Sequence, residues 1–350
     1  MAKIISIDTL RAERRQGTYE EQVPYMFRGE LKTVTKKIVN GEMELLSFDR
    51  PIGEMFTTPE GIENILKKVT LDMDFGREQV PLLYKPIYRA LSNPNFPRLV
   101  PAAEFSQAQT VFLEHAEGEE IKFGARKTLK GDGVPIITYT SGFDGWTVEL
   151  EKFDETWRLD QFSSALGESH NALLNHIHLH PILSYAYAAK NQTAANAVGG
   201  TYLEKLRNTL RDALKHSGQD KNPVTNARRR PTILLSASVN QVDLQDALGR
   251  MVIGGTEYAP LGQIQTMIFY DGWSVTVGDK TYTYDGVPAG KVYLVDAGRY
   301  FLELIKQDLI VDSGEADTSR LLRAQMVAYL MRGVWASPAD AVEEVTLPVA

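Results

Sequence analysis

The chain of 350 residues contains no cysteine. Disulfides, thiolate metal sites and cysteine nucleophiles are therefore excluded. Long apolar runs are also missing, and none approaches the ~20 residues that a membrane-spanning helix needs. The first ten residues lack an apolar core and lead straight into Arg11, Arg14 and Arg15, so we expect no secretory signal. These absences fit a reducing compartment and predict that the chain has no membrane partner.

The chain also lacks an excess of positive charge. Its net charge of −7 argues against a dedicated nucleic-acid-binding protein. The first 40 residues are an exception, because they carry eight basic residues against five acidic ones. Two interpretations of this segment stay open. It could be an arm that lies near phosphate or on an acidic neighbour, or an ordinary solvated segment.

The common motifs of nucleotide-binding and hydrolytic enzymes are absent. Gly254-Gly255 is not followed by the lysine of a phosphate-binding loop, and there is neither a Gly-x-Ser-x-Gly nor a Gly-x-Gly-x-x-Gly sequence. Asp72 and Asp74 have a spacing that is more typical of a surface than of a metal site. Glu343 and Glu344 are neighbours on a predicted strand, so they should face opposite ways and form no acid–base pair.

The best lead for catalysis is a group of histidines, namely His176, His178 and His180, with His170 six residues before them. On a helix, His176 and His180 share a face and His178 points elsewhere. Imidazole is a common zinc ligand, but no His-Glu-x-x-His order and no third ligand is evident. The alternative is a set of packed or exposed histidines near a helix end. We assign no catalytic, cofactor-binding or metal-binding residue.

One further basic cluster, Arg228-Arg-Arg230, lies in a predicted polar loop over residues 217–230. It could bind phosphate or a carboxylate cluster on a neighbouring molecule. A solvated loop is the favoured interpretation.

The central stretch combines two predicted strands and one long helix. Residues 134–140 and 146–152 alternate in the manner of strands, and the glycines of 141–145 predict a turn between them. A helix is predicted from Glu155 to Ile177, roughly 35 Å long, with Asp154 as its N-cap and Pro181 kinking or ending it. Residues on one predicted apolar face are Leu159, Phe162, Leu166, His170, Leu173 and Ile177.

Shorter elements are predicted on both sides of this stretch. Before it we expect a helix over 60–70 behind Pro59, a proline-rich extended connection over 80–100, and strands 107–117 and 119–130 around Gly118. These strands would belong to a projecting β-loop over 105–152. After it, residues 185–198 favour a helix, 201–216 form an amphipathic helix, and 231–238 form a strand that is buried on both faces.

The remainder of the chain is predicted to be mainly β. A helix over 241–251 is capped by Asn240, short strands follow, 297–309 is mixed, 319–334 is helix or strand, and 341–347 is a terminal strand. The short strands are 266–270, 274–277, 281–284 and 290–295.

This order of elements resembles the major capsid proteins of tailed bacteriophages, which have the Hong Kong 97 fold. Stretches with a familiar character are Val134-Pro-Ile-Ile-Thr-Tyr before Gly142-Phe, Asp271-Gly-Trp273 with Tyr282-Thr-Tyr-Asp-Gly286, and Gly333-Val-Trp-Ala-Ser-Pro-Ala-Asp-Ala-Val342. The resemblance covers most of the chain as architecture, without a diagnostic motif.

The resemblance implies an α+β capsid fold in five parts. These are an N-terminal arm and short helix (1–75), a connection and extended β-loop (76–152), a peripheral domain with the spine helix (153–229), an axial mixed domain (230–334) and a terminal strand returning to the peripheral domain (335–350).

The function that the resemblance implies is that of a structural subunit rather than an enzyme. Copies would assemble through hexamers and pentamers into an icosahedral viral capsid around double-stranded DNA, touched non-specifically, with no cofactor. Scaffolding, portal and cement proteins are expected partners, the virion capsid is the expected location, and assembly would occur in the host cytoplasm.

Some members of the family cross-link subunits through a lysine–asparagine bond. Lys122, Lys127 or Lys130 could supply the lysine, but no asparagine follows Asn240, so we predict no such bond.

Three rival functions stay open. An encapsulin has the same fold and encloses a cargo enzyme. A tail or baseplate component would form rings or tubes. A metalloenzyme would use His176, His178 or His180.

Overall fold

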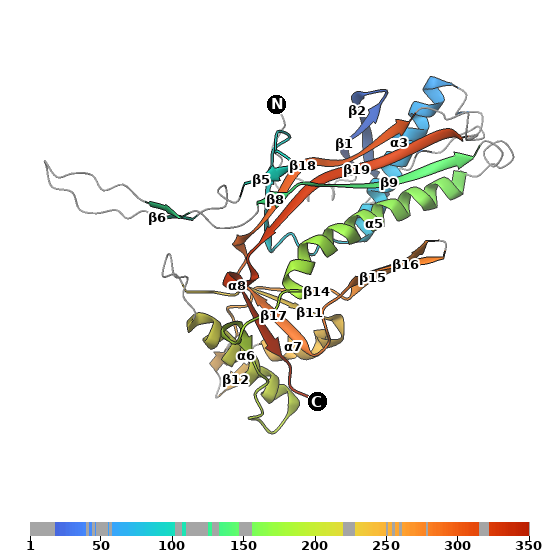
Figure 1. The fold of residues 1–350 in the computed structure, drawn as a ribbon. Helices are drawn as coiled ribbons and strands as arrows, with labels where there is room; N and C mark the ends of the chain where they lie inside the picture. The colour runs from blue at the N-terminus through green and yellow to red at the C-terminus, as the bar shows by residue number, and fades with distance from the viewer. Residues whose placement is uncertain are drawn as a thin grey trace, which may run out of the picture. The chain divides into compact units, whose positions relative to one another are not determined.

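The structure is a computed structural model of the whole chain. It describes the residues 18–39, 42–43, 46, 55, 58–101, 107–109, 125–127, 133–146, 156–219, 228–249, 251–253, 256–258, 261–277, 279–314 and 322–349. Helices and strands are both well represented, so the predicted α+β class is confirmed (Figure 1).

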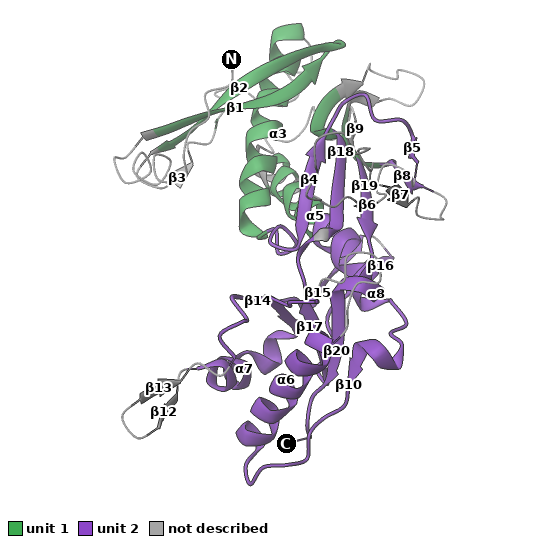
Figure 2. Cartoon of the chain, turned by 90° about the vertical axis from the view of Figure 1, so that its left-hand side faces the viewer, with its two compact units in different colours: residues 1–81, 138–172, 307–331 green, residues 82–137, 173–306, 332–350 purple. Residues whose placement is uncertain are grey.

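The chain forms two compact units (Figure 2). Unit 1 comprises Met1–Pro81, Thr138–Ala172 and Gln307–Met331, and unit 2 comprises Leu82–Ile137, Leu173–Lys306 and Arg332–Ala350. The division falls within three long elements, α5 (Thr156–Leu183), β18 (Gly298–Gly314) and β19 (Leu322–Ala336).

In unit 1 a long hairpin packs on a helix. The strands β1 (Thr18–Phe27) and β2 (Glu30–Val39) pair antiparallel over ten residues, and β2 also pairs with β3 (Glu42–Met43). One face of the hairpin is apolar and lies on α3 (Pro59–Gln79). The cluster between them consists of Val23, Tyr25, Phe27, Val34, Leu66 and Leu71. The described part of the predicted arm is therefore a packed hairpin.

The helix predicted over 60–70 is present but longer, since α3 continues to Gln79. It begins where predicted, because Pro59 occupies its first turn and Thr58 Oγ1 accepts a hydrogen bond from Gly61 N at 3.1 Å. The helices α3 and α5 approach closely at Gly76 and Gly167. A Cβ on Gly76 would collide with the backbone of Ser164, and one on Gly167 with that of Met73. Only glycine permits this approach.

The long helix α5 is confirmed, and its buried face matches the predicted one in part, because Leu159 and His170 are buried as expected. Leu166, Leu173 and Ile177 are only half-buried, whereas Asn171 and His178 are buried. Leu174, Leu179 and Ile182 complete the buried face. The helix runs two residues beyond Pro181, so the proline lies in its last turn. The predicted cap Asp154 lies outside the described residues.

A seven-stranded sheet follows the order β3-β2-β1-β18-β19-β9, with β4 (Tyr88–Ser92) paired to β18. Two predictions about these strands are wrong, since the expected turn at 141–145 is part of β9 (Ile137–Trp146) and most of the mixed stretch 297–309 belongs to the 17-residue strand β18. For 319–334, where helix and strand were both open, the described residues from Leu322 onward form the strand β19. Partners far away in the sequence hold these residues extended, which local propensity does not reveal.

Unit 2 contains a five-stranded mixed sheet in the order β10-β20-β17-β11-β14. Its strands are β10 (Gln192–Thr193), β20 (Val342–Thr346), β17 (Lys291–Val295), β11 (Ile233–Ser236) and β14 (Thr266–Phe269). All four residues of β11 are buried, as its apolar sequence predicts. The helices α6 (Tyr202–Gln219) and α7 (Gln241–Leu248) lie against the sheet (Figure 1).

The core between this sheet and its helices joins buried residues from each layer. Leu206 and Leu210 of α6, Leu244 of α7, and Leu234 and Leu294 of the sheet belong to one apolar cluster. The predicted helix over 201–216 and the terminal strand over 341–347 are thus confirmed. Asn240 stands at the N-cap position of α7, although its side chain donates to Ser236 Oγ and Ala289 O instead of capping the helix.

The segment 185–198 is not helical as predicted. It contains only a short 3-10 turn, η2 (Ala189–Asn191), and β10. Asn191 fixes this path, because its side chain donates to Ala339 O at 2.9 Å and to Val342 O at 2.8 Å. The proline-rich connection packs as expected, with Tyr84 and Tyr88 buried and Phe96 against the cluster of Val100, Val134 and Leu304.

Four pairs of strands form separate two-stranded sheets among the described residues. They are β5 (Leu99–Val100) with β8 (Val134–Pro135), β6 (Gln107–Gln109) with β7 (Ala125–Lys127), β12 (Met251–Ile253) with β13 (Thr256–Tyr258), and β15 (Gly272–Val277) with β16 (Lys280–Asp285). β6 and β7 pair antiparallel, and the rest of the predicted strands 107–117 and 119–130, with Gly118, lies outside the described residues. No helix in the described part of the chain is long and apolar enough to cross a bilayer.

Candidate assembly surfaces

The β15–β16 hairpin has one apolar and one polar face. Cross-strand partners in an antiparallel pair share a face. The register pairs Trp273 with Tyr284 and Val275 with Tyr282, which places these four on the apolar face. The opposite face carries hydroxyl side chains that bond to each other across the strands, in the pairs Ser274–Thr283 (3.3 Å) and Thr276–Thr281 (3.0 Å). This alternation is visible in the sequence, although it gave no functional assignment there.

The inner end of the apolar face is covered by α5. The imidazole of His176 stacks on the ring of Tyr284, with centroids 4.4 Å apart and planes inclined by 12°. Trp273 lies beside the same tyrosine, with centroids 5.5 Å apart. His180, one turn after His176, has its ring centroid 5.0 Å from that of His176. The predicted shared face of these two histidines is therefore confirmed, and it contacts a hairpin.

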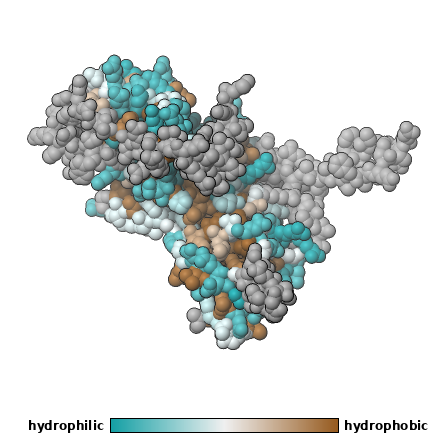
Figure 3. Space-filling model, turned by 180° about the vertical axis from the view of Figure 1, so that it is seen from behind, coloured by the Kyte–Doolittle hydropathy of each residue, from teal (hydrophilic) through white to brown (hydrophobic). Residues whose placement is uncertain are grey.

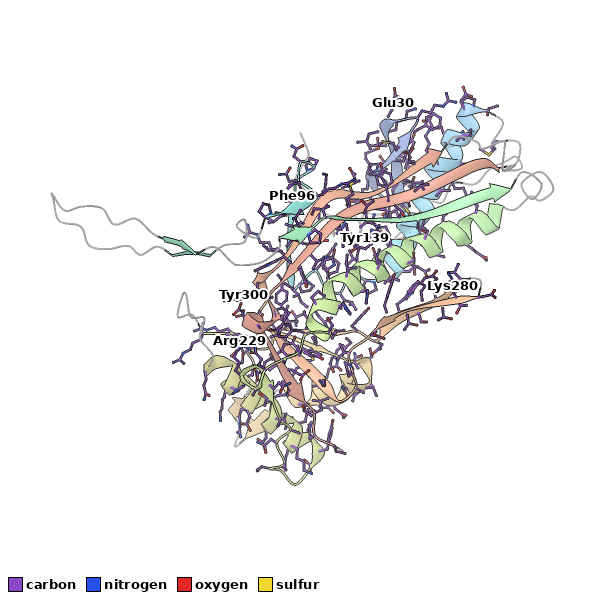
Figure 4. All side chains as sticks on the ribbon, in the orientation of Figure 1. Glu30, Phe96, Tyr139, Arg229, Lys280 and Tyr300 are labelled. Atoms are coloured by element: carbon purple, nitrogen blue, oxygen red, sulfur yellow. The ribbon has the colours of Figure 1, made fainter. Side chains whose placement is uncertain are left out.

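The outer end of the same face is uncovered. Val277 is 63% exposed and Tyr282 is 51% exposed. Figure 4 shows Lys280 at this end of the hairpin, where β16 begins. An apolar face of which half packs on its own chain and half faces outward is typical of a surface that contacts another molecule.

Further large apolar side chains are exposed elsewhere in each unit. In unit 2, Val239 (72%) lies in the 3-10 turn Ser238–Asn240 and Val242 (68%) lies in α7, which follows it; in unit 1, Leu31 (64%) lies near the β1–β2 turn. Ser238 N donates to Asp271 Oδ1 at 2.7 Å, so the turn before α7 adjoins the inner end of the hairpin. On the face shown in Figure 3, hydrophobic residues are likewise exposed among polar ones.

His178 belongs to a buried network in unit 2. Its ring stacks on Tyr84 with centroids 3.7 Å apart, its Nδ1 donates to Leu174 O at 2.6 Å, and its Nε2 lies 3.3 Å from Glu303 Oε1. The same carboxylate accepts a hydrogen bond from Tyr84 Oη at 2.9 Å and forms an ion pair with Arg332. The network joins α5, β18, β19 and the proline-rich connection.

Electrostatics hold this network in one protonation state. Burial alone would raise the pKa of Glu303, but the hydrogen bond from His178, the charges of Arg332 and His178, and the hydrogen bond from Tyr84 outweigh burial and lower the pKa. Burial and the charge of Glu303 raise the pKa of Tyr84 and of Tyr88. The carboxylate stays ionised and the tyrosines stay neutral, as suits a structural anchor with no exposed reactive group.

A second buried network surrounds Glu343 on β20. Its carboxylate accepts from Thr193 Oγ1 at 2.7 Å and from His216 Nδ1 at 2.6 Å, and lies 3.2 Å from Arg229 Nη1. The interpretation of residues 228–230 as a solvated loop is wrong for Arg229, which is buried, while the arginines on either side are exposed. Arg229 is labelled in Figure 4.

The prediction that Glu343 and Glu344 face opposite ways is confirmed. Glu344 instead pairs with Lys291 Nζ at 2.7 Å and accepts from Gln192 Nε2 at 3.0 Å.

The aspartates of α3 form ion pairs within unit 1. Asp72 lies 3.0 Å from Lys68 Nζ, and Asp74 lies 2.5 Å from Lys36 Nζ. Lys36 is buried and also reaches Glu78 at 2.6 Å, and Lys32 pairs with Glu63 at 3.3 Å. Several basic residues of the N-terminal stretch are thus neutralised by their own chain.

The structure does not assemble the histidines into a metal site. In the described part of the chain, no group of three or more His, Asp or Glu side chains is placed to hold a metal ion. His170 Nδ1 lies 2.9 Å from Asn171 Oδ1, and His178 contacts Tyr84 and Glu303. Of the lysines considered for cross-linking, Lys127 is the last residue of β7, and Lys122 and Lys130 lie outside the described residues. The pair Gly254-Gly255 also lies outside them.

The chain matches no family model and no curated protein sequence. It is similar to solved structures that are mostly phage capsids. The capsid of the cyanophage P-SCSP1u is 12% identical with a TM-score of 0.49, over 77% of this chain and 89% of that one. A virus-like particle from Pyrococcus furiosus is 12% identical with a TM-score of 0.45, over 80% and 98%.

An encapsulin complex from Synechococcus elongatus PCC 7942 is 11% identical with a TM-score of 0.43, over 77% of this chain and 88% of that one. These proteins are of the kind that the sequence resembles. The TM-scores of these three structures are all under 0.5.

Proposed function

We propose that this chain is a structural subunit that assembles with copies of itself into an icosahedral viral capsid around double-stranded DNA. The observation that carries the proposal is the β15–β16 hairpin. A two-stranded hairpin is marginal in water unless something covers it. Here the chain covers only the inner end of the apolar face, and Val277 and Tyr282 stay exposed. A neighbouring copy lying on these side chains would remove them from water.

The arrangement of other elements supports the same function. The chain has a 28-residue helix, a β6–β7 pair at a wide sequence separation, and a mixed sheet that ends with the strand β20. In the proposed shell, the arm (1–75), the β-loop (76–152) and the spine helix bridge subunits. The axial domain (230–334) packs around the centres of hexamers and pentamers. Scaffolding, portal and cement proteins are the proposed partners, and assembly takes place in the host cytoplasm.

The proposed contact with DNA is non-specific and electrostatic. The chain carries a net charge of −7, and the pairing of Lys32 and Lys36 with carboxylates leaves less free positive charge on the β1–β2 hairpin. We therefore expect weak binding of free DNA by the isolated subunit and a strong dependence on salt.

The buried networks support a structural role over catalysis. Both use their charged groups against partners in the same chain, at short distances and away from water. We propose that the chain is no enzyme and takes no cofactor. Metal analysis of the purified chain checks this, since stoichiometric zinc, iron or manganese would favour a metalloenzyme.

The proposal is tested by light scattering and nucleic acid analysis of the chain after a sizing column. We expect particles of many copies, with nuclease-protected DNA when they are isolated from virions. Particles that instead hold a cargo protein and no genome would show an encapsulin. A monomer or dimer at micromolar concentration would contradict self-assembly.

A further inference from the structure

The contact between α5 and the inner end of the β15–β16 hairpin contains a titratable group with an unusual environment. Nδ1 of His176 is buried and has no hydrogen-bond partner among the described residues. A neutral imidazole tolerates this, because with its proton on Nε2 the other nitrogen needs only to accept. A protonated imidazole does not, because both nitrogens must then donate and a buried donor without an acceptor is costly.

We propose that His176 is a pH-sensitive latch that holds the β15–β16 hairpin on α5 while it is neutral and releases the hairpin when it is protonated. Among the described residues, the stacking of His176 on Tyr284 joins α5 to the hairpin. Trp273 packs beside the same tyrosine. Release exposes the inner end of the apolar face, so acid changes how much apolar surface the hairpin presents.

The charged and titratable groups around His176 oppose one another. On α5, His180 has its ring centroid 5.0 Å away, and its positive charge disfavours a second one. On β16, Tyr284 is the stacking partner, and Asp285 favours the protonated imidazole through its charge. Tyr270 interacts with both of these residues; burial raises its pKa to about 12, and burial also raises the pKa of Tyr284, so neither tyrosine titrates in acid.

The balance favours the neutral form. Burial, followed by the charge of His180, lowers the pKa of His176, and Asp285 opposes them only in part. A histidine with a lowered folded-state pKa stabilises the latched state above its ordinary pKa of about 6.5. That stability is lost as the pH falls below this value, because protons then bind preferentially to the released state. The latch goes beyond the proposed function and does not depend on it.

The test is hydrogen–deuterium exchange of the purified full-length chain between pH 7.5 and pH 5, corrected for the intrinsic pH dependence of exchange. We expect the protection of residues 272–285 to fall by up to about tenfold for each pH unit below the ordinary histidine pKa of about 6.5. The fully buried strand β11 should keep its protection and serves as the internal reference.

Two variants distinguish the latch from general acid sensitivity. His176→Phe keeps an aromatic ring for Tyr284 but cannot titrate, so the hairpin should stay protected at pH 5. His180→Asn removes a neighbouring charge that lowers the pKa of His176 in the latched state, so acid should reduce the protection of the hairpin less than in the unchanged chain. Equal loss of protection in His176→Phe would overturn the proposal, as would an equal or greater loss of protection at pH 5 in His180→Asn.

The assembly state is measured alongside by light scattering. Particles that dissociate in acid while residues 272–285 keep their protection refute the latch and leave the shell subunit standing. Loss of protection in a chain that never assembles supports the latch and contradicts the proposed function.

Discussion

The five-stranded sheet of unit 2 and the β15–β16 hairpin in the same unit use β-branched and aromatic residues in opposite ways. In the sheet, β11 is buried along its entire length and β17 nearly so. In the hairpin, apolar and hydroxyl residues alternate, and the outer apolar residues are exposed. The sheet gains its stability from its own chain, whereas the hairpin has apolar surface left for a partner. The comparison therefore assigns folding stability to the first region and association to the second.

The largest effect is expected in the buried network that anchors α5. Glu303→Gln leaves Arg332 buried beside a neutral partner, and breaking a buried ion pair in this way costs about 3–5 kcal/mol. Chemical denaturation measures the loss. The matched control is Glu30→Gln, at an exposed carboxylate beside the β1–β2 turn, which should change stability by less than about 0.5 kcal/mol. Similar losses in both variants would contradict the anchor.

The free energy of unfolding should depend on pH differently in the unchanged chain and in Glu303→Gln. The lowered pKa of Glu303 means that its contribution is present above the ordinary carboxyl pKa and is lost as the pH falls through the lower folded-state value. The unchanged chain should therefore lose stability in acid more steeply than Glu303→Gln. Denaturation curves at pH 7, 5 and 4 check this. Parallel pH profiles for the two chains would show that another group is responsible.

A paired truncation compares the sheet and the hairpin directly. Leu234→Ala removes a fully buried side chain from β11 and should cost about 2–5 kcal/mol. Val277→Ala removes an exposed side chain from β15 and should cost less than about 0.5 kcal/mol in the unassembled chain. Denaturant midpoints of both variants give the difference. Equal costs would show that the hairpin is covered within its own chain.

The smallest effect on folding should accompany a clear effect on assembly. Tyr282→Ser should leave the free energy of unfolding within about 0.5 kcal/mol, because the side chain is half exposed. Burying a large apolar side chain contributes about 1.5–3 kcal/mol, so its loss should weaken association by tenfold or more. The control is Thr281→Ser, which keeps a hydroxyl on the polar face. Light scattering across a dilution series compares the two variants. Equal assembly of both would show that the hairpin is not part of the interface.

The elements that could be predicted from the sequence have a pattern that is complete within a short window. The leucine stripe of α6 and the apolar run of β11 are such cases. The length of β18 could not be predicted, nor could the choice between helix and strand for β19 be made, because partners distant in the sequence determine both. β18 pairs with β4 near Leu304 and with β1 at Asp312. The continuation of β9 through Gly142 and Gly145 was likewise hidden, since glycines usually indicate a turn.

The candidate surface was only partly predictable. Helical spacing correctly placed His176 and His180 on one face, but their contact with the hairpin depends on Tyr284, over 100 residues away. The burial of His178 depends in the same way on Tyr84 and Glu303. Arg229 looked solvated because its neighbours in the sequence are polar, and its partner Glu343 lies near the other end of the chain.

Electron microscopy of the full chain expressed alone tests the central claim of self-assembly most directly. After a sizing column, negatively stained particles should be closed shells, or rings of five and six copies if a scaffold is needed. The unchanged chain and Thr281→Ser should form them, and Tyr282→Ser should form fewer. A uniform field of monomers or dimers at micromolar concentration would contradict the account.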